Sequence, residues 1–189
     1  MKRQPKDSIY EQCARTTKAL SSPKRLEILD LLSQSEKTVE SLAEQANLGI
    51  KNASAQLKEL KSALLVESRR NGKYVYYRLS NQSVANFLID LRKFSEAQFV
   101  EIQKMASELF ADVELMKPIN RKQLLARVRK GEVILLDVRP TNEFQQSHLP
   151  FAISVPISEL QKELKNFPKH KEIIAYCRGP YCLLAKEAV

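Results

Sequence analysis

Long apolar runs, cysteines and histidines are scarce in this 189-residue chain, and each shortage excludes a class of protein. No apolar run approaches the roughly 20 residues that span a bilayer, and the polar start leads into no apolar signal core. Three cysteines are too few for a disulfide scaffold. We therefore expect a cytoplasmic protein with no membrane partner, in which thiol chemistry is favoured over structural disulfides. Cys13, which stands alone, is expected to be a small buried side chain.

The composition is otherwise that of an ordered globular protein. Hydrophobic residues make up 43% of the chain and charged residues 28%, and the length suits two small domains. The formal net charge of +9 favours an acidic partner, nucleic acid first. The placement of that charge decides what it indicates.

The first half of the chain has a helix-rich pattern. One helix is expected from Ser8 to Leu20, a second after the cap signal Ser22-Pro23, and a short third after Thr38. The break at Leu48-Gly49 ends the third helix. Three short helices in this order are a scaffold on which a fourth can be presented.

The fourth expected helix has the clearest apolar stripe, formed by Ile50, Ala53, Leu57, Leu60 and Leu64. Steps of three and four residues predict that this stripe is buried on one face. The opposite face carries cations and small side chains, namely Lys51, Asn52, Ser54, Ala55, Lys58 and Ser62. Such a face suits a groove about 12 Å wide, although a merely solvated face fits as well when the helix is taken alone.

A basic β-hairpin is predicted next, because two strand-like runs, 65–70 and 73–79, flank Asn71-Gly72. Between residues 51 and 78 seven cations face two acids, a net of +5, whereas residues 1–116 carry 18 cations and 15 acids, a net of +3. The hairpin cations include Arg69, Arg70 and Lys73. This order predicts a winged helix-turn-helix, in which the helix reads the major groove and the hairpin grips backbone or minor groove.

Three segments, 20–32, 54–60 and 71–79, resemble the ArsR/SmtB family of bacterial winged-helix repressors. The resemblance spans about residues 8–105. It implies a homodimer that binds a pseudo-palindromic operator in double-stranded DNA and dissociates when an inducer binds. It also implies a recognition helix over 51–62, with Lys51, Asn52, Ser54 and Ala55 nearest the base edges. Leu64 stands where the family usually has Gly, so the turn into the hairpin is expected to differ.

One long helix is expected from Gln82 to about Leu115. Its apolar members exceed what so small a domain can cover, which favours a dimer seam with the helix over 8–20; a helix packed only on its own domain is the alternative. The ligands of the family's metal sites are missing, since residues 38–44 hold no Cys and residues 83–116 no His. We expect neither standard metal site and no cofactor.

The second half alternates strands and helices. A helix opened by Asn120 ends at Gly131, and the continuous apolar run 133–136 is typical of a strand buried in a parallel sheet. A short helix with Glu143, a short strand at 152–155, a helix at 157–164 and a strand at 173–176 follow. We therefore predict an α+β winged-helix domain over 1–115, followed by a partial α/β parallel-sheet domain over 116–189.

A cysteine follows the last strand on a loop that contains Gly and Pro, and residues 183–188 then indicate a helix start. Loop amides and the positive end of that helix are expected to converge on the Cys177 sulfur, which would lower its pKa. This pattern is typical of a reactive thiolate.

Segments 136–139, 147–156 and 176–182 resemble a rhodanese domain, and the whole chain resembles ArsR-type regulators that carry one. The resemblance implies that Cys177 accepts sulfane sulfur as a persulfide, and the expected small-molecule partner is a sulfane-sulfur donor or a small thiol. Arg178 then adds positive charge, and amides of the loop face the outer sulfur; the loop residues are Gly179, Tyr181 and Cys182. Asp137 and Arg139 are expected to order the floor of the loop, although they stand among the candidate catalytic residues.

The sequence departs from the rhodanese pattern at two places, and each departure affects the expected structure around the loop. Phe151 replaces the usual Gly and is expected to reshape the edge of the pocket. A rhodanese domain normally continues for tens of residues past this loop and adds a strand within the sheet. Either the sequence is a fragment or the domain is incomplete; for an incomplete domain we expect a gap between strands, a poorly preorganised loop and weak sulfurtransferase turnover.

Other functions remain open at this point. A phosphatase or arsenate-reductase loop needs an Arg six residues after the Cys, where this chain has Leu183. The Cys-x4-Cys pair supplies only half a zinc site but suits arsenite. The leading hypothesis is a DNA-binding repressor that senses or transfers reactive sulfur at Cys177. The alternatives are a sulfurtransferase that uses its N-terminal half to dimerise, and a thiol- or arsenite-responsive regulator without sulfur transfer.

Overall fold

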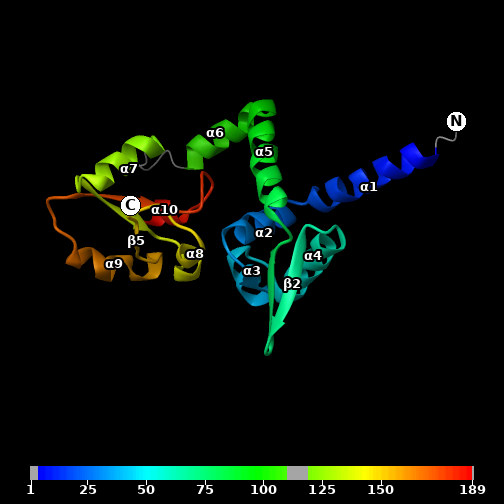
Figure 1. Ribbon diagram of the computed structural model, residues 1–189, viewed down its shortest axis with the longest axis horizontal. Coiled ribbons are helices and arrows are strands. Elements are labelled where there is room, and N and C mark those ends of the chain that lie inside the picture. Colours follow the sequence, from blue (N-terminus) through cyan, green and yellow to red (C-terminus); the bar gives the residue numbers. More distant parts are fainter. Residues whose placement is uncertain (1–3, 110–118, 189) are drawn as a thin grey trace. The chain divides into compact units, whose positions relative to one another are not determined.

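The computed structural model describes residues 4–109 and 119–188. The chain divides into two compact units, residues 1–94 and 95–189, and Figure 1 labels their helices and strands. The boundary expected at 115/116 lies outside the described residues. Each unit is built around one three-stranded sheet.

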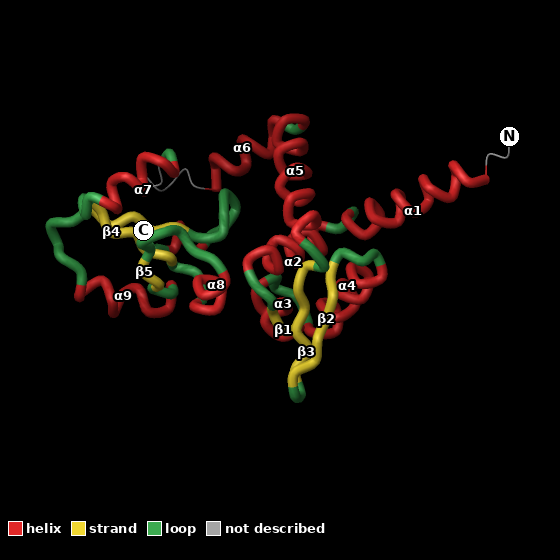
Figure 2. Tube along the Cα trace, in the orientation of Figure 1, coloured by secondary structure: helices red, strands yellow, loops and turns green. Residues whose placement is uncertain are grey.

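The N-terminal unit combines helices with an antiparallel sheet. Its helices are α1 (Gln4–Leu20), α2 (Pro23–Gln34), α3 (Val39–Gln45), α4 (Ile50–Ser62) and most of α5 (Gln82–Gln98), and its strands are β1 (Lys37–Thr38), β2 (Val66–Asn71) and β3 (Tyr74–Leu79). The strand order is β1-β3-β2, and Figure 2 shows the β2–β3 hairpin extending beyond the helices. Buried side chains of α2, α3 and α4 form the core, among them Leu29, Leu42 and Leu57, and each stabilises the fold by about 1.5–3 kcal/mol.

The turn from α4 into β2 keeps a left-handed residue without a glycine. Leu64 has φ +59°, and the Leu65 N–H donates to the Leu60 carbonyl at 3.0 Å, the closing hydrogen bond of a Schellman C-cap. The expectation that this turn would differ from a glycine turn is therefore wrong. Leu64 and Ile50 were also expected to be buried, but they are 77% and 56% exposed, because Ile50 is the first residue of α4 and Leu64 lies beyond its last residue.

The single long helix expected after the hairpin is also wrong. α5 ends at Gln98 and α6 (Val100–Leu109) begins after a break at Phe99; residues 110–115 lie outside the described part. Exposed apolar side chains line both helices, namely Phe87, Ile89, Phe94, Phe99, Val100 and Met105. α1 extends away from the body of its unit (Figure 1), and Cys13 on it is exposed rather than buried.

The C-terminal unit is a parallel sheet with helices on its faces. Its elements after α6 are α7 (Arg121–Arg129), β4 (Val133–Asp137), α8 (Thr141–Gln146), β5 (Ile153–Ser154), α9 (Leu160–Glu163), β6 (Glu172–Tyr176) and α10 (Leu184–Glu187), with 3-10 turns η1 (Ile157–Glu159) and η2 (Leu164–Asn166) around α9. The expected helix over 157–164 is thus shorter and irregular. Asn120 caps α7 by accepting from the Lys122 and Gln123 amides.

The strand order is β5-β4-β6. β4 pairs with β6 along its whole length, from Val133 opposite Glu172 to Asp137 opposite Tyr176, so the expected gap is not found between these described strands. Side chains of β4 are buried on both faces, which packs Leu136 into one apolar cluster and Leu135 into another. Since parallel strands end at the same edge, Asp137 and Cys177 are brought to one end of the sheet.

Candidate functional sites

The outward face of α4 is solvent-exposed, and its inward face is buried against the core. Ala53, Leu57 and Leu60 are buried, whereas the expected DNA-facing side chains are all exposed: Lys51, Asn52, Ser54, Ala55 and Lys58. Gln56 links this face to the scaffold, because it donates to Asn52 at 3.0 Å and accepts from Arg25 at 3.1 Å. The face therefore presents two ammonium groups among small side chains on a rigid helix.

The hairpin cations divide into paired and outward ones. Arg69 donates to both carboxylate oxygens of Glu36 and lies over the Tyr76 ring at 4.8 Å. This hydrogen bond, followed by the Arg69 charge, lowers the pKa of Glu36. Sequence reasoning missed Glu36, since its partner is 33 residues away.

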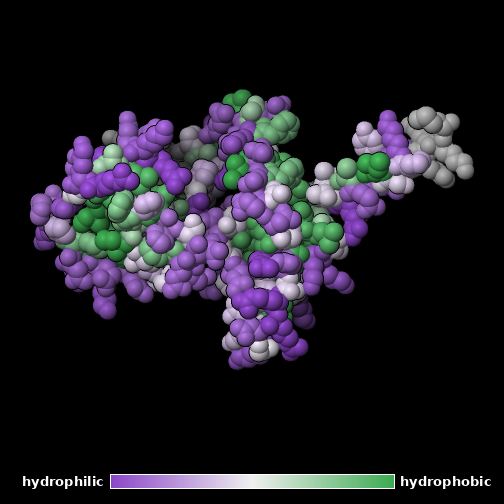
Figure 3. All heavy atoms as spheres, viewed as in Figure 1, coloured by the Kyte–Doolittle hydropathy of each residue, from purple (hydrophilic) through white to green (hydrophobic). Residues whose placement is uncertain are grey.

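The outward cations stand at the hairpin tip. Gly72 has φ +59° at the first position of the two-residue loop that joins Asn71 to Tyr74, where a type II′ turn requires glycine. Arg70 Nε donates to the Gly72 carbonyl at 3.2 Å, and Lys73 Nζ lies 5.2 Å from the centre of the Tyr74 ring. Figure 3 shows the hairpin end as a hydrophilic surface, which suits contact with a phosphate backbone.

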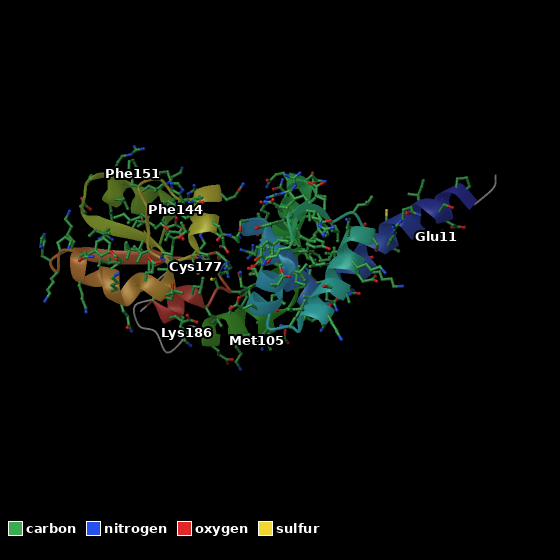
Figure 4. All side chains as sticks on the ribbon, turned by 90° about the horizontal axis from the view of Figure 1, so that it is seen from below. Glu11, Met105, Phe144, Phe151, Cys177 and Lys186 are labelled. Atoms are coloured by element: carbon green, nitrogen blue, oxygen red, sulfur yellow. The ribbon has the colours of Figure 1, made fainter. Side chains whose placement is uncertain are left out.

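The second candidate site is the thiol loop that follows β6. Cys177 lies at the end of β6, beside α8 (Figure 4), and is half-buried together with Cys182. The Cys182 N–H donates to the Gly179 carbonyl at 3.1 Å, and the Cys177 sulfur lies 3.5 Å from the Cys182 carbonyl oxygen. The loop thus folds back on itself and brings its two thiols together.

Backbone N–H groups of the loop act on the sulfur of Cys182, the second cysteine. The pKa of Cys182 is lowered to about 6, first by a hydrogen bond from the Cys177 thiol, and then, against burial, by the backbone N–H groups of Arg178 and Leu184 and the Arg178 charge. The Cys182 amide, expected to face the outer sulfur of Cys177, is instead bonded within the loop. α10 is only four residues long, so individual amides act here rather than a helix dipole.

Arg178 does not offer its side chain to the loop as a free charge. Its guanidinium contacts Glu143 of α8, with Nε 2.9 Å from Oε2 and a terminal nitrogen 2.7 Å from Oε1. Burial works to lower the pKa of Arg178, but the Glu143 carboxylate and the thiol pair outweigh it and hold that pKa above its usual value. Sequence reasoning placed Glu143 on a short helix but gave it no role, and no local signal marks it, because the rest of α8 is mostly exposed.

Asp137 and Arg139 form a second buried ion pair, at the carboxyl end of β4. Arg139 Nε lies 2.9 Å from Asp137 Oδ1, and a terminal nitrogen donates to the Ser147 carbonyl at 2.7 Å. Tyr176 packs beside them, its pKa raised to about 12 mainly by burial, and its hydroxyl accepts from the Leu149 N–H at 3.0 Å. These contacts tie the ends of β4 and β6 to the 147–149 turn.

Phe151 occupies the turn next to this edge with φ +67°. Its side chain is 57% exposed, and Arg129 lies 5.8 Å above its ring. The glycine-type backbone is thus retained, and the phenyl ring is added outside it.

Clusters of metal-ligand side chains and membrane-spanning helices are both absent from the described ranges, 4–109 and 119–188. No group of three or more His, Cys, Asp or Glu side chains is positioned there to hold a metal ion. No helix in those ranges is long and apolar enough to cross a membrane.

Two family models match the chain in the order in which the two sites occur. Residues 22–68 match the bacterial regulatory protein, arsR family, and residues 120–188 match the rhodanese-like domain. The chain is also 40% identical over 184 residues to the HTH-type transcriptional regulator Rv0324 of Mycobacterium tuberculosis, an alignment that covers 97% of this chain and 80% of that one. The chain belongs to the ArsR family of transcriptional regulators and carries a rhodanese-like domain.

Other relatives of this ArsR-family regulator match about half of its length. The biofilm growth-associated repressor of Xylella fastidiosa is 33% identical over 88 residues, which is 47% of this chain and 77% of that protein. The homodimeric winged helix-turn-helix DNA-binding domain of a possible ArsR-family regulator from Mycobacterium bovis is 41% identical, with a TM-score of 0.47, over 48% of this chain and 84% of that one. The two family models themselves match different halves of the chain, the arsR-family model residues 22–68 and the rhodanese-like model residues 120–188.

Proposed function

We propose that this ArsR-family regulator is a dimeric DNA-binding repressor whose affinity for its operator changes when Cys177 accepts sulfane sulfur. The observation that carries the proposal is the thiol pair itself. It lies at the end of a parallel strand, on a loop anchored by the buried Arg178–Glu143 ion pair, in a chain whose other half presents a basic helix and hairpin. A sulfur-handling site fused to a DNA-binding surface suits a sensor.

The proposed DNA contacts are the exposed side chains of α4 and the hairpin tip. Lys51, Asn52, Ser54 and Ala55 face the bases, while Lys58, Arg70 and Lys73 neutralise phosphates. Arg69 has a lesser part, because Glu36 already binds its guanidinium.

Dimerisation is supported by apolar surface that the single chain leaves open. Ile9 and Tyr10 on α1 are each 64% exposed, and Phe94 on α5 is 63% exposed. Two copies that pair these helices would cover them, as amphipathic helices require. Sedimentation velocity of the full chain should give a dimer, and Ile9→Asp with Phe94→Asp should give a monomer; a monomeric parent chain would contradict this part of the proposal.

The experiment for the proposed function measures DNA binding and sulfur transfer on one preparation. A duplex selected by the protein from a random-sequence pool should bind in preference to a scrambled duplex. Turnover of thiosulfate with cyanide should stay low. Strong turnover without sequence preference would instead support a sulfurtransferase that uses its N-terminal half to dimerise.

A further inference from the structure

The two cysteines of the loop lie close together in space. Five positions separate them, yet the Cys177 sulfur lies 3.5 Å from the carbonyl oxygen of Cys182. A hydrogen bond from the Cys177 thiol, and then the backbone N–H groups of Arg178 and Leu184, lower the pKa of Cys182. These contacts favour the thiolate form of Cys182, next to the Cys177 sulfur.

The two amides that act on Cys182 come from residues on either side of it in the loop. Glu143 is fully buried and fixes the Arg178 side chain, so the Arg178 amide is held in place next to the second sulfur. Leu184 belongs to the apolar cluster that also includes Cys177 and Leu160, which positions its own amide. Both donors therefore come from anchored residues.

We propose that Cys182 is the resolving thiolate of this loop: it attacks the inner sulfur of a persulfide on Cys177, forms a Cys177–Cys182 disulfide and expels hydrosulfide. This inference rests on the proposed function, because it needs a persulfide on Cys177. It makes the disulfide, rather than the persulfide, the end state of sulfur sensing.

The first step loads Cys177 from a low-molecular-weight persulfide, RS–SH. As the Cys177 sulfur attacks the outer sulfur of the donor, its proton passes to the Cys182 thiolate and then to the departing RS⁻. The products are Cys177–S–SH, the Cys182 thiolate and RSH. A new S–S bond forms, the donor S–S bond breaks, and the loop keeps one negative charge.

The second step consumes that persulfide. The Cys182 sulfur bonds to the inner sulfur of Cys177, and the bond to the outer sulfur breaks, so that HS⁻ leaves with the electron pair. Cys182 is oxidised and the outer sulfur is reduced, so no further oxidant is needed. A thiolate whose conjugate acid ionises near the working pH is an effective attacking group in such exchanges.

The test treats the full chain in a Cys13→Ser background with glutathione persulfide without oxygen, then alkylates and measures intact mass and released hydrosulfide. The parent should lose two hydrogens, retain no extra sulfur and release about one HS⁻ per chain. Cys182→Ser and Cys182→Ala should both retain one added sulfur on Cys177, with hydrosulfide release slowed at least about tenfold.

The two hypotheses fail in different ways. A parent chain that keeps a persulfide on Cys177 with Cys182 free to alkylate overturns the resolving role and leaves the proposed function standing. Sulfur loss from Cys182→Ser as fast as from the parent overturns it as well. If neither the parent nor either Cys182 variant acquires sulfur or a disulfide, Cys177 is not a sulfur acceptor and both hypotheses fail. Use of two Cys182 variants guards against a folding defect in one.

Discussion

Glu143 and Arg178 form a buried, bidentate ion pair that joins α8 to the thiol loop. The Glu143 side chain is fully buried and that of Arg178 is 13% exposed. The pair also connects a residue that sequence reasoning left without a role to one that it assigned to catalysis. Because the Arg178 guanidinium is paired with Glu143, Arg178 acts on the thiols mainly through its backbone N–H.

Removal of the Glu143 charge should therefore destabilise the C-terminal unit. Glu143→Gln leaves a largely buried guanidinium without its counter-charge, a change that costs about 3 kcal/mol in comparable sites. Urea unfolding followed by far-UV circular dichroism measures it. Glu132→Gln is the matched control, because the exposed Glu132 lies 3.8 Å from Arg127 and surface pairs contribute below about 1 kcal/mol. Equal effects of the two substitutions would contradict the buried-pair interpretation.

The ionisation of Cys182 should control its rate of alkylation. Because the thiolate is the nucleophile and the pKa of Cys182 is lowered to about 6, its reaction with iodoacetamide should be half-maximal near that pH. Below it the rate should fall about tenfold per pH unit. In Cys177→Ala, which removes the largest lowering contribution, the midpoint should move toward the ordinary thiol value of about 8.5.

The same ionisation gives the sign of a stability change. The folded loop releases its proton at a lower pH than the unfolded chain does, so the free energy of unfolding should rise as pH increases from about 6 toward 8.5. As pH falls through the pKa of Cys182 in the folded chain, this gain in the free energy of unfolding should be lost.

The alkylation experiment has its own control. Peptide mapping identifies which thiol has reacted. A midpoint for Cys182 in the folded chain that equals the midpoint in urea would contradict the geometry of the loop.

Two non-glycine residues with left-handed backbones should be replaceable by glycine with a gain in stability. The left-handed conformation costs an L-residue about 1–2 kcal/mol in the folded state. Glycine avoids this cost, but its more flexible unfolded chain lowers the free energy of unfolding by about 0.5–1 kcal/mol. Leu64→Gly and Phe151→Gly should each gain up to about 1 kcal/mol, since both side chains are mostly exposed. Glu59→Gly, inside α4, is the control and should lose about 1 kcal/mol; a loss at Leu64 would show that its side chain has contacts in the dimer.

Phosphate contacts should appear in the salt dependence of DNA binding. Lys58→Ala or Arg70→Ala should each lower the slope of log affinity against log salt by about 1, and Arg69→Ala by less, because Glu36 holds that guanidinium. Lys162→Ala is a demanding control. The net charge of +9 less the +3 of residues 1–116 leaves +6 on residues 117–189, so a non-specific charge effect would register there too. Equal slope changes for Lys58 and Lys162 would contradict the proposed interface.

Local patterns predicted most of the fold. The Thr38 and Asn120 caps, the buried stripe at the centre of α4 and the buried run of β4 all follow from short-range rules of helix and strand formation. The wrong predictions concern residues at the ends of helices, where those rules cease to apply. Ile50 and Leu64 continue the period of the stripe but pass beyond the core, and Phe99 interrupts a pattern that was periodic on both sides.

The candidate sites were only partly predictable for a different reason. The sequence identified the residues on the thiol loop, but Glu143 is 35 positions from Arg178, and Glu36 is 33 from Arg69. Such pairings depend on how strands order themselves in a sheet. The position of Cys182 beside Cys177 depends on one turn, closed by the Cys182–Gly179 hydrogen bond. No spacing rule in the sequence distinguishes the two sulfurs.

The coupling of sulfur chemistry to DNA binding is the central claim, and an anisotropy titration with the selected duplex tests it most directly. In the Cys13→Ser background, affinity before and after glutathione persulfide should differ by about tenfold, a usual size for coupling between sites, and dithiothreitol should restore it. The same chain with Cys177→Ser should bind equally well before and after treatment. Identical responses of the two chains, or no response in either, would contradict the account.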